Sequence, residues 1–99
     1  MGYAMYLNRY PIELNIAAAG TVVTGTLSVA VDVLDIRPAI AIWLDESDVS
    51  TAGNGLTLNT RVFVGADERR LLPWHSNTIA VINAVSGETG LVRAEGWVM

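Results

Sequence analysis

The side chains that enzymes use most often for catalysis are scarce in this chain. Its 99 residues include one histidine, His75, and neither cysteine nor lysine. A serine nucleophile would need His75 as its general base, and no serine lies in a nucleophile-elbow sequence. The absence of cysteine removes disulfides, thiolate metal sites and thiol nucleophiles. We therefore predict that the protein is not an enzyme and uses no cofactor.

An acidic run offers the only local cluster of oxygen ligands. Asp45, Glu46 and Asp48 lie in the longest polar stretch of the chain, residues 45–55. Calcium takes about six to eight oxygen ligands, but this run lacks the spacing of acids around a central glycine that defines an EF-hand loop. We interpret the stretch as a solvated loop and leave calcium binding open as an alternative.

Trp74 and His75 form the best candidate for a ligand platform. Sandwich modules hold sugars on exposed aromatic rings, and Trp74 lies in an irregular segment rather than in an apolar strand pattern. The competing interpretation is that Trp74 caps one end of the domain from inside, because tryptophan is usually well buried. Carbohydrate binding at these two residues is our alternative hypothesis for function, and it requires an exposed Trp74.

A second candidate binding feature is the pair Arg69 and Arg70, which follows Asp67 and Glu68. Two guanidinium forks could bind a carboxylate or a phosphate of a partner. More often, such a run is a surface turn whose charges satisfy one another weakly. Both interpretations remain open at this point.

The charge composition argues against nucleic acid and against a membrane as partners. Six scattered arginines are outweighed by ten acids to a net charge of -4, whereas duplex binding relies on a clustered basic footprint. No stretch approaches the roughly 20 apolar residues of a membrane span. Only 16% of the residues are charged, against about 25% in ordinary domains. Such a surface fits coverage by protein partners, although a valine-rich core also accounts for the apolar share.

Residues 21–35 form the longest strand-like pattern that could organise the fold. Leu27, Val29, Val31 and Val33 alternate with small or polar residues, which is the period of a β-strand. Residues 21–33 fully extended would span roughly 40 Å, against about 17 to 20 Å for a usual strand. We predict one long strand that bends at Gly25 to serve two sheets or that leaves the domain.

Further strands are predicted wherever apolar and polar residues alternate between turn signals. We expect residues 39–44 to form a central strand, residues 71–74 to form a short irregular or edge segment, and residues 86–90 to be a hairpin loop. The remaining predicted strands are residues 12–16, 56–64, 77–85 and 91–99.

About seven or eight strands without a long helical period predict an all-β fold, specifically an antiparallel β-sandwich or jelly-roll-like barrel with a short N-terminal arm. The immunoglobulin-like rival lacks its Cys and Trp pattern. Pro11 ends the helix-like spacing of the first residues. We therefore assign residues 1–10 to the arm and residues 11–99 to a single β-sandwich domain.

The two ends of the chain are our candidate interface. An aromatic arm stays ordered only by packing on its own domain or on another subunit, and both remain possible. The apolar C-terminus completes its own sheet or adds to that of a neighbour. The candidate interface residues are Tyr3, Met5, Tyr6, Tyr10, Trp97, Val98 and Met99.

Together these features predict a non-enzymatic structural protein. We expect a homo-oligomer, or a repeated component of a larger protein shell or tube, with a phage or virus particle as the most concrete setting and the virion as its location. In general character the chain resembles small all-β virion proteins such as capsid decoration or cement subunits. No motif specific to that class is present.

Overall fold

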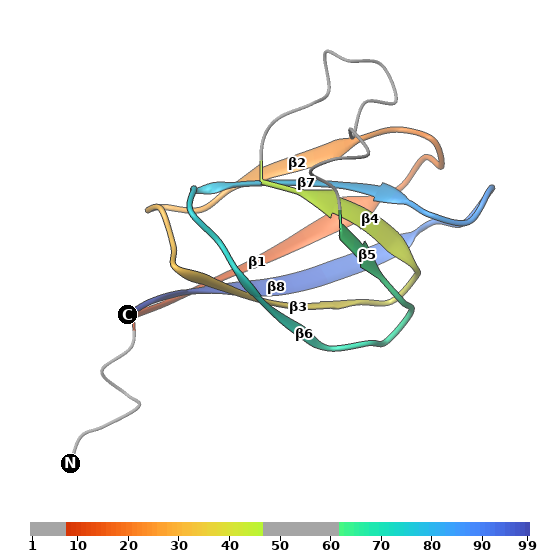
Figure 1. Cartoon of the computed structure of the whole chain (residues 1–99). Coiled ribbons are helices and arrows are strands. Elements are labelled where there is room, and N and C mark those ends of the chain that lie inside the picture. Colours follow the sequence, from red (N-terminus) through yellow and green to blue (C-terminus); the bar gives the residue numbers. More distant parts are fainter. Residues whose placement is uncertain (1–7, 47–61) are drawn as a thin grey trace.

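The computed structural model describes residues 8–46 and 62–99, which form eight β-strands and no helix. This confirms the all-β prediction. The strands are arranged in two separate antiparallel sheets that do not close into a barrel (Figure 1). The strands are β1 (Asn8–Ile16), β2 (Val23–Thr26), β3 (Val33–Pro38), β4 (Ile42–Asp45), β5 (Val62–Val64), β6 (Arg70–Pro73), β7 (Thr78–Asn83) and β8 (Gly90–Val98).

The two sheets have four strands each. Sheet A has the order β1-β8-β3-β6, and sheet B has the order β2-β7-β4-β5. Most connections therefore cross from one sheet to the other, and only β4 and β5 are both consecutive and paired among the described strands. Among the described strands β4 lies between β7 and β5, which confirms the central position predicted for residues 39–44, and β6 lies at an edge, which fits the edge alternative for residues 71–74.

A single apolar core lies between the sheets, which gives the fold its sandwich-like character. In each sheet, alternate residues turn inward, as the period of a strand requires. The inward residues of both sheets belong to one cluster of buried side chains. Its largest fully buried members are Ile16, Leu34, Ile36 and Val92 from sheet A and Ile42, Leu44, Val64, Ile79 and Val81 from sheet B.

The prediction of one continuous strand over residues 21–35 is wrong. β2 belongs to sheet B and β3 to sheet A, and residues 27–32 cross between them. Leu27 and Val31 are buried in the core, whereas Val29 between them is 37% exposed. The inward positions of this segment are thus four residues apart rather than two.

Backbone hydrogen bonds explain why residues 27–32 do not continue the strand pairing of β2. The Leu27 amide donates to the Asn77 carbonyl at 2.7 Å and the Val31 amide donates to the Ser76 carbonyl at 3.1 Å, so the crossing binds the turn before β7 instead of a neighbouring strand. Gly25 is not the corner, because it lies within β2 opposite Ile79.

The predicted hairpin at residues 86–90 is also wrong. The strands on either side of it, β7 and β8, are both present, but they lie in different sheets. The segment between them is therefore a crossing, in which Gly87 has a φ of 82°. Of the predicted strand 56–64, only β5 falls within the described residues.

The first strand runs across the boundary that we predicted between arm and domain. β1 begins at Asn8 and continues through Pro11 to Ile16, paired along its length with β8. Proline is tolerated here because β1 is an edge strand in the described part of sheet A. Tyr10 packs against the core. Three residues of the predicted arm, Tyr3, Met5 and Tyr6, lie outside the described residues.

Candidate functional site

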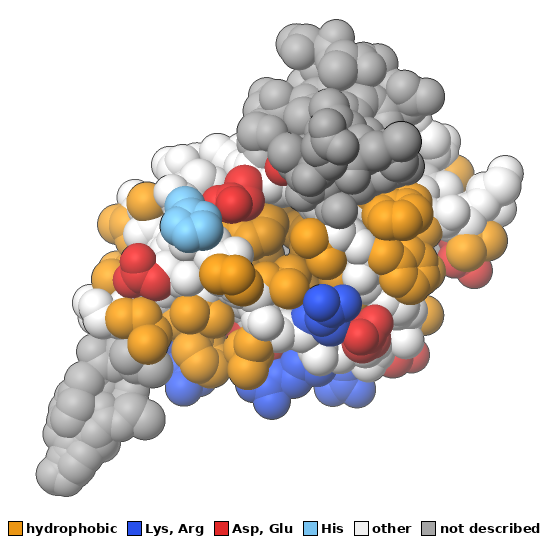
Figure 2. Space-filling model, in the orientation of Figure 1, with side chains coloured by type: hydrophobic (Ala, Val, Ile, Leu, Met, Phe, Trp, Pro, Cys, Tyr) orange, Lys and Arg blue, Asp and Glu red, His pale blue; other side chains and the backbone are white. Residues whose placement is uncertain are grey.

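The outward positions of sheet A carry most of the arginines that the structure describes. In β3 and β8 the inward residues fill the core, so the alternate residues Arg37 and Arg93 are exposed on the outer face. These two arginines are direct cross-strand partners. Arg69 lies on the other side of β3, one residue before the Ile36–Arg70 pair that begins β6. We call Arg93, Arg37 and Arg69 the arginine row; basic side chains follow the lower border of Figure 2, on the sheet A side of the molecule.

The two outer members of the arginine row are held by acids. Arg93 donates from Nε to the Glu13 carboxylate on β1 at 2.9 Å. Arg69 donates from Nε and Nη2 to both oxygens of Asp35, at 3.0 and 2.8 Å. This bidentate bond, followed by the charge of Asp35, raises the pKa of Arg69 above its ordinary value.

A fourth outer arginine is paired in the same way at the end of the sheet where β8 finishes. Arg9 on β1 donates to Glu95 at 3.3 Å and lies over the ring of Trp97, 4.9 Å from its centroid. The Trp97 indole donates to the same carboxylate at 3.0 Å. Glu95 is thereby shared between a guanidinium and an indole, which fixes all three side chains.

Arg37 is the member of this face that has no acidic partner within residues 8–46 and 62–99. The three outer acids, Glu13, Asp35 and Glu95, each bind one of the other three arginines. Like charges that oppose each other directly across a sheet repel. The positive charge of Arg37 is therefore uncompensated by the sheet that carries it.

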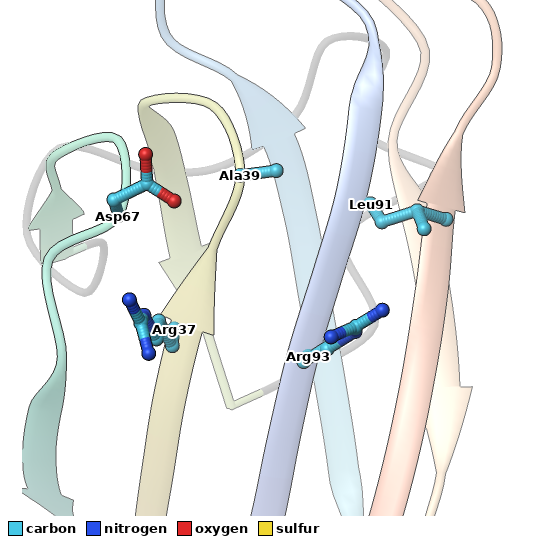
Figure 3. A pocket seen from close by; sticks show the side chains of 5 residues that line it. All are labelled: Arg37, Ala39, Asp67, Leu91 and Arg93. Atoms are coloured by element: carbon cyan, nitrogen blue, oxygen red, sulfur yellow. The ribbon is translucent and has the colours of Figure 1, made fainter.

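Two shallow hollows meet at Arg37 and Arg93. The first, of about 350 Å³, is lined by Arg37, Ala39, Asp67, Leu91 and Arg93 (Figure 3). The second, of about 380 Å³, is lined by all three members of the arginine row together with Pro11, Asp35, Ala94 and Glu95. In Figure 3, Arg93 is turned away from Arg37, in keeping with its bond to Glu13 on β1.

Asp67 forms the acidic rim of the first hollow. Its amide donates to the Pro38 carbonyl at 2.7 Å, and its φ of 59° is the left-handed conformation that Asp and Asn tolerate better than most residues. Its carboxylate makes no hydrogen bond or ion pair with any described side chain. The hollow thus presents guanidinium donors on one part of its wall and a single carboxylate on another.

The predicted aromatic platform is not present, because Trp74 is only 3% exposed. Its indole donates to the Thr78 carbonyl at 3.1 Å, and its rings join the apolar core. Its neighbour His75 is exposed; the His75 amide donates to the Glu46 carboxylate at 2.6 Å, and Nδ1 of its ring lies 3.4 Å from that carboxylate. The turn after β6 directs the indole inward and leaves the imidazole at the surface beside Glu46.

The acidic run does not assemble into a metal site in the described part of the chain. Asp45 is buried at the end of β4 and accepts a hydrogen bond from the Glu46 amide at 2.6 Å. Glu46 is occupied by His75, and Asp48 lies outside the described residues. No three histidine, aspartate or glutamate side chains cluster within residues 8–46 and 62–99.

The C-terminal members of the predicted interface belong to their own sheet. Trp97 is paired with β1 on one side and with β3 on the other, and Val98 is paired with Asn8. Within the described sheet Trp97 is paired on both sides, so the C-terminal strand completes its own sheet, which is one of the two predicted alternatives. Met99 remains 77% exposed, with its amide bonded to the Asp32 carboxylate at 2.9 Å, and its role in an interface stays a prediction.

The adjacent arginines Arg69 and Arg70 fit the surface-turn alternative, because both lie beside acids. Arg69 and Arg70 are adjacent in the chain but point to different partners, since Arg70 donates to the Phe63 carbonyl at 3.2 Å and lies 3.9 Å from Glu68. In the structure Arg37 and Arg93 both lie on outward positions, and the strand order makes them neighbours. That strand order could not be read from the sequence.

The comparisons with known proteins add no relative. No family model matches the chain, and neither a curated protein nor a solved structure matches it. None of the described residues forms a helix long and apolar enough to cross a membrane.

Proposed function

We propose that the protein is a non-enzymatic structural subunit that assembles with copies of itself, within a larger shell such as that of a virus or phage particle. The strand pairing supports a jelly-roll fold. The first strand pairs with the eighth, the second with the seventh, the third with the sixth and the fourth with the fifth, as in a long hairpin wound into two sheets. Double-sheet jelly rolls built in this way occur in viral capsid and lectin domains.

A fold alone does not determine a function. Surface residues are therefore needed to choose between a capsid-type and a lectin-type role. A lectin-type role would use an exposed ring, and the candidate ring of Trp74 is buried. The surface that favours assembly is the outer face of sheet B. Its apolar members are Val22, Trp43, Phe63, Ala80 and Ile82. Ala80 and Ile82 are already buried within the chain, Val22 and Trp43 are half-buried, and Phe63 is exposed.

The single observation that carries the proposal is the aromatic pair of Trp43 and Phe63 on this outer face. In an antiparallel sandwich the outward residues are usually polar. Here Trp43 and Phe63 stack edge to face, with ring centroids 5.3 Å apart, and Phe63 is 46% exposed. No arginine lies on the outward positions of β2, β4, β5 and β7. An apolar sheet face that bears an aromatic pair suits a surface covered by another subunit.

Light scattering coupled to size-exclusion chromatography tests this proposal across a range of protein concentrations. We expect a mass above that of one chain, and we expect Phe63→Ser to shift the equilibrium towards the monomer. Leu71→Ser is the matched control, because Leu71 is more exposed, at 54%, but lies on β6 in sheet A. Deletion of residues 1–7, which leaves β1 whole, tests the predicted contribution of Tyr3, Met5 and Tyr6.

The possible outcomes distinguish a failure of self-assembly from a different location of the interface. A wild-type protein that stays monomeric at every concentration contradicts assembly through self-contacts. An oligomer that Leu71→Ser dissociates, while Phe63→Ser does not, places the interface on sheet A instead. A deletion of residues 1–7 with no effect removes the arm from the interface and leaves the sheet B surface as its basis.

A further inference from the structure

The outer face of sheet A has a charge that its own side chains leave uncompensated. Arg37 stands between Arg93 and Arg69, and each of these neighbours is already bonded to a different acid. We propose that Arg37 is the centre of an oxyanion-binding site, which takes a carboxylate or a phosphate group, with Arg93 and Arg69 at its sides. This inference is independent of self-assembly, because it concerns the opposite sheet.

The chemistry of the side chain supports this assignment. A guanidinium presents a planar fork of N–H donors that matches the two oxygens of a carboxylate or phosphate, and it stays charged at any working pH. Arg37 makes no hydrogen bond to the described residues, so its donors are available for a ligand. Arg93 and Arg69 line the same hollow. Asp35 and Glu95 line it too, but each of these acids is already bonded to another arginine.

The position of Arg37 in the sheet provides a second, independent reason. Like charges on directly opposed residues destabilise a sheet, and Arg37 and Arg93 are such a pair. In this structure the repulsion is met by turning Arg93 towards Glu13, away from Arg37 (Figure 3). A bound anion would remove the remaining repulsion, so ligand binding and sheet stability are coupled at this site.

The carboxylate of Asp67 should weaken anion binding at this site. Its carboxylate lines the same hollow as Arg37 without forming an ion pair there. A negative charge on the rim repels a bound anion, so replacing Asp67 by asparagine should strengthen binding. Asparagine also tolerates the positive φ of this position, which makes Asp67→Asn a conservative change.

Nuclear magnetic resonance titration of the isotope-labelled protein tests the site directly. Sodium phosphate and sodium acetate are added in separate experiments, with sodium chloride used to keep the ionic strength constant. We expect a saturable shift of the Arg37 side-chain Nε–H signal, and the anion with the lower dissociation constant shows whether phosphate or carboxylate is preferred. A shift that is not saturable, or that sodium chloride alone reproduces, overturns the proposal.

Matched variants decide whether the effect is local. Arg37→Gln should weaken binding about tenfold or more, the usual worth of a hydrogen bond to a charged group. Arg37→Lys, which keeps the charge but loses the fork, should weaken it less. Arg70→Gln removes the same charge at a residue bonded to the Phe63 carbonyl, outside the hollows, and should leave the affinity within about twofold. Equal losses in Arg37→Gln and Arg70→Gln would overturn the proposal.

Thermal unfolding in chloride supplies a readout that does not depend on the ligand. Because Arg37 directly opposes Arg93 and forms no ion pair with a described acid, the melting temperature of Arg37→Gln should equal or exceed that of the wild type. A lower melting temperature of Arg37→Gln would reveal a stabilising partner for Arg37. In the anion titration, weaker binding by Asp67→Asn would identify Asp67 as part of the binding surface. Either result contradicts the site as proposed.

Discussion

Replacement of Gly96 by alanine is the sharpest test of how the crossing between the sheets is packed. Gly96 lies in β8 and faces the core. A Cβ atom added there would lie 2.6 Å from Val31 Cγ1, 2.8 Å from Leu27 Cδ1 and 3.0 Å from Val31 Cγ2. Ordinary contacts between carbon atoms are roughly 3.5 to 4.0 Å, so the new methyl group would overlap two side chains of the crossing.

The loss of unfolding free energy expected for Gly96→Ala depends on how little Val31 and Leu27 are able to move. Val31 is 1% exposed and β-branched, so its rotamer is stiff, and Leu27 is 4% exposed. Overpacking a filled core costs about 1 to 3 kcal/mol in the free energy of unfolding. In a domain of this size, each kcal/mol corresponds to a fall of about 4 to 8 °C in the melting temperature.

A double-mutant cycle isolates the contact. Val31→Ala removes both valine methyl groups that meet the new Cβ, and by itself it should cost about 2 kcal/mol from lost burial. In the double variant, the methyl group of alanine occupies part of the space that valine leaves. The loss should therefore be smaller than the sum of the single losses, by about 0.5 kcal/mol or more.

Urea unfolding followed by tryptophan fluorescence measures all four proteins of the cycle. Gly87→Ala is the control, because a Cβ there meets nothing within 4 Å while the φ of 82° disfavours a side chain. It should cost about 1 kcal/mol and show no coupling to Val31→Ala. A Gly96→Ala protein as stable as the wild type, or a cycle without coupling, would refute the packing of the crossing onto β8.

Two further predictions concern the side chains that sequence reasoning singled out. Trp74→Phe should lower the free energy of unfolding by about 1 to 3 kcal/mol, because the smaller ring leaves part of the buried site empty and the hydrogen bond to Thr78 is lost. Urea unfolding measures this loss, and a change within about 0.5 kcal/mol would contradict the prediction. Asp35→Asn should lower the melting temperature at low salt and less so in high salt, because it breaks the bidentate bond to Arg69. Asp35 raises the pKa of Arg69 above its ordinary, strongly basic value. The contribution of the ion pair is therefore fully present below the unfolded-state pKa and is lost only as the pH rises through the still higher folded pKa, so the deficit should be equal at pH 7 and pH 9.

The alternation of side chains could be read from the sequence, but its interruption could not. Leu27, Val29 and Val31 have the same parity, and a strand would bury all three or none. In the structure the middle residue points outward because the chain arches between sheets. What directs it are hydrogen bonds to Ser76 and Asn77, about fifty residues further along, and these are invisible to a local pattern.

The connection between β7 and β8 illustrates the same limit. The glycines and small residues around Gly87 indicated a turn, and the chain does turn there. Turn chemistry fixes local geometry but not the sheet to which each flanking strand belongs. The pairing of β8 with β1 and β3 is instead decided by which faces bury the largest apolar surface, a property of the whole chain.

The arginine row could be predicted only in part, for a related reason. The apolar period of Leu27, Val29, Val31 and Val33 would turn odd-numbered residues inward. In β3, however, the even-numbered Leu34 and Ile36 are buried, so Arg37 is exposed. Whether an exposed arginine is paired depends on neighbours across the sheet, and those are fixed by the strand order. Adjacency along the chain suggested Arg69 and Arg70, whereas adjacency across the sheet isolates Arg37.

The two proposed surfaces depend on different interactions, so raising the salt concentration should affect self-association and anion binding differently. Association through Trp43 and Phe63 on sheet B would rest on apolar burial, which salt strengthens or leaves unchanged. Anion binding at Arg37 on sheet A would rest on charge, which salt screens. If one surface served both purposes, the Phe63→Ser and Arg37→Gln variants would change assembly and anion binding together. Because these side chains lie on opposite sheets, each variant should change one property and leave the other intact.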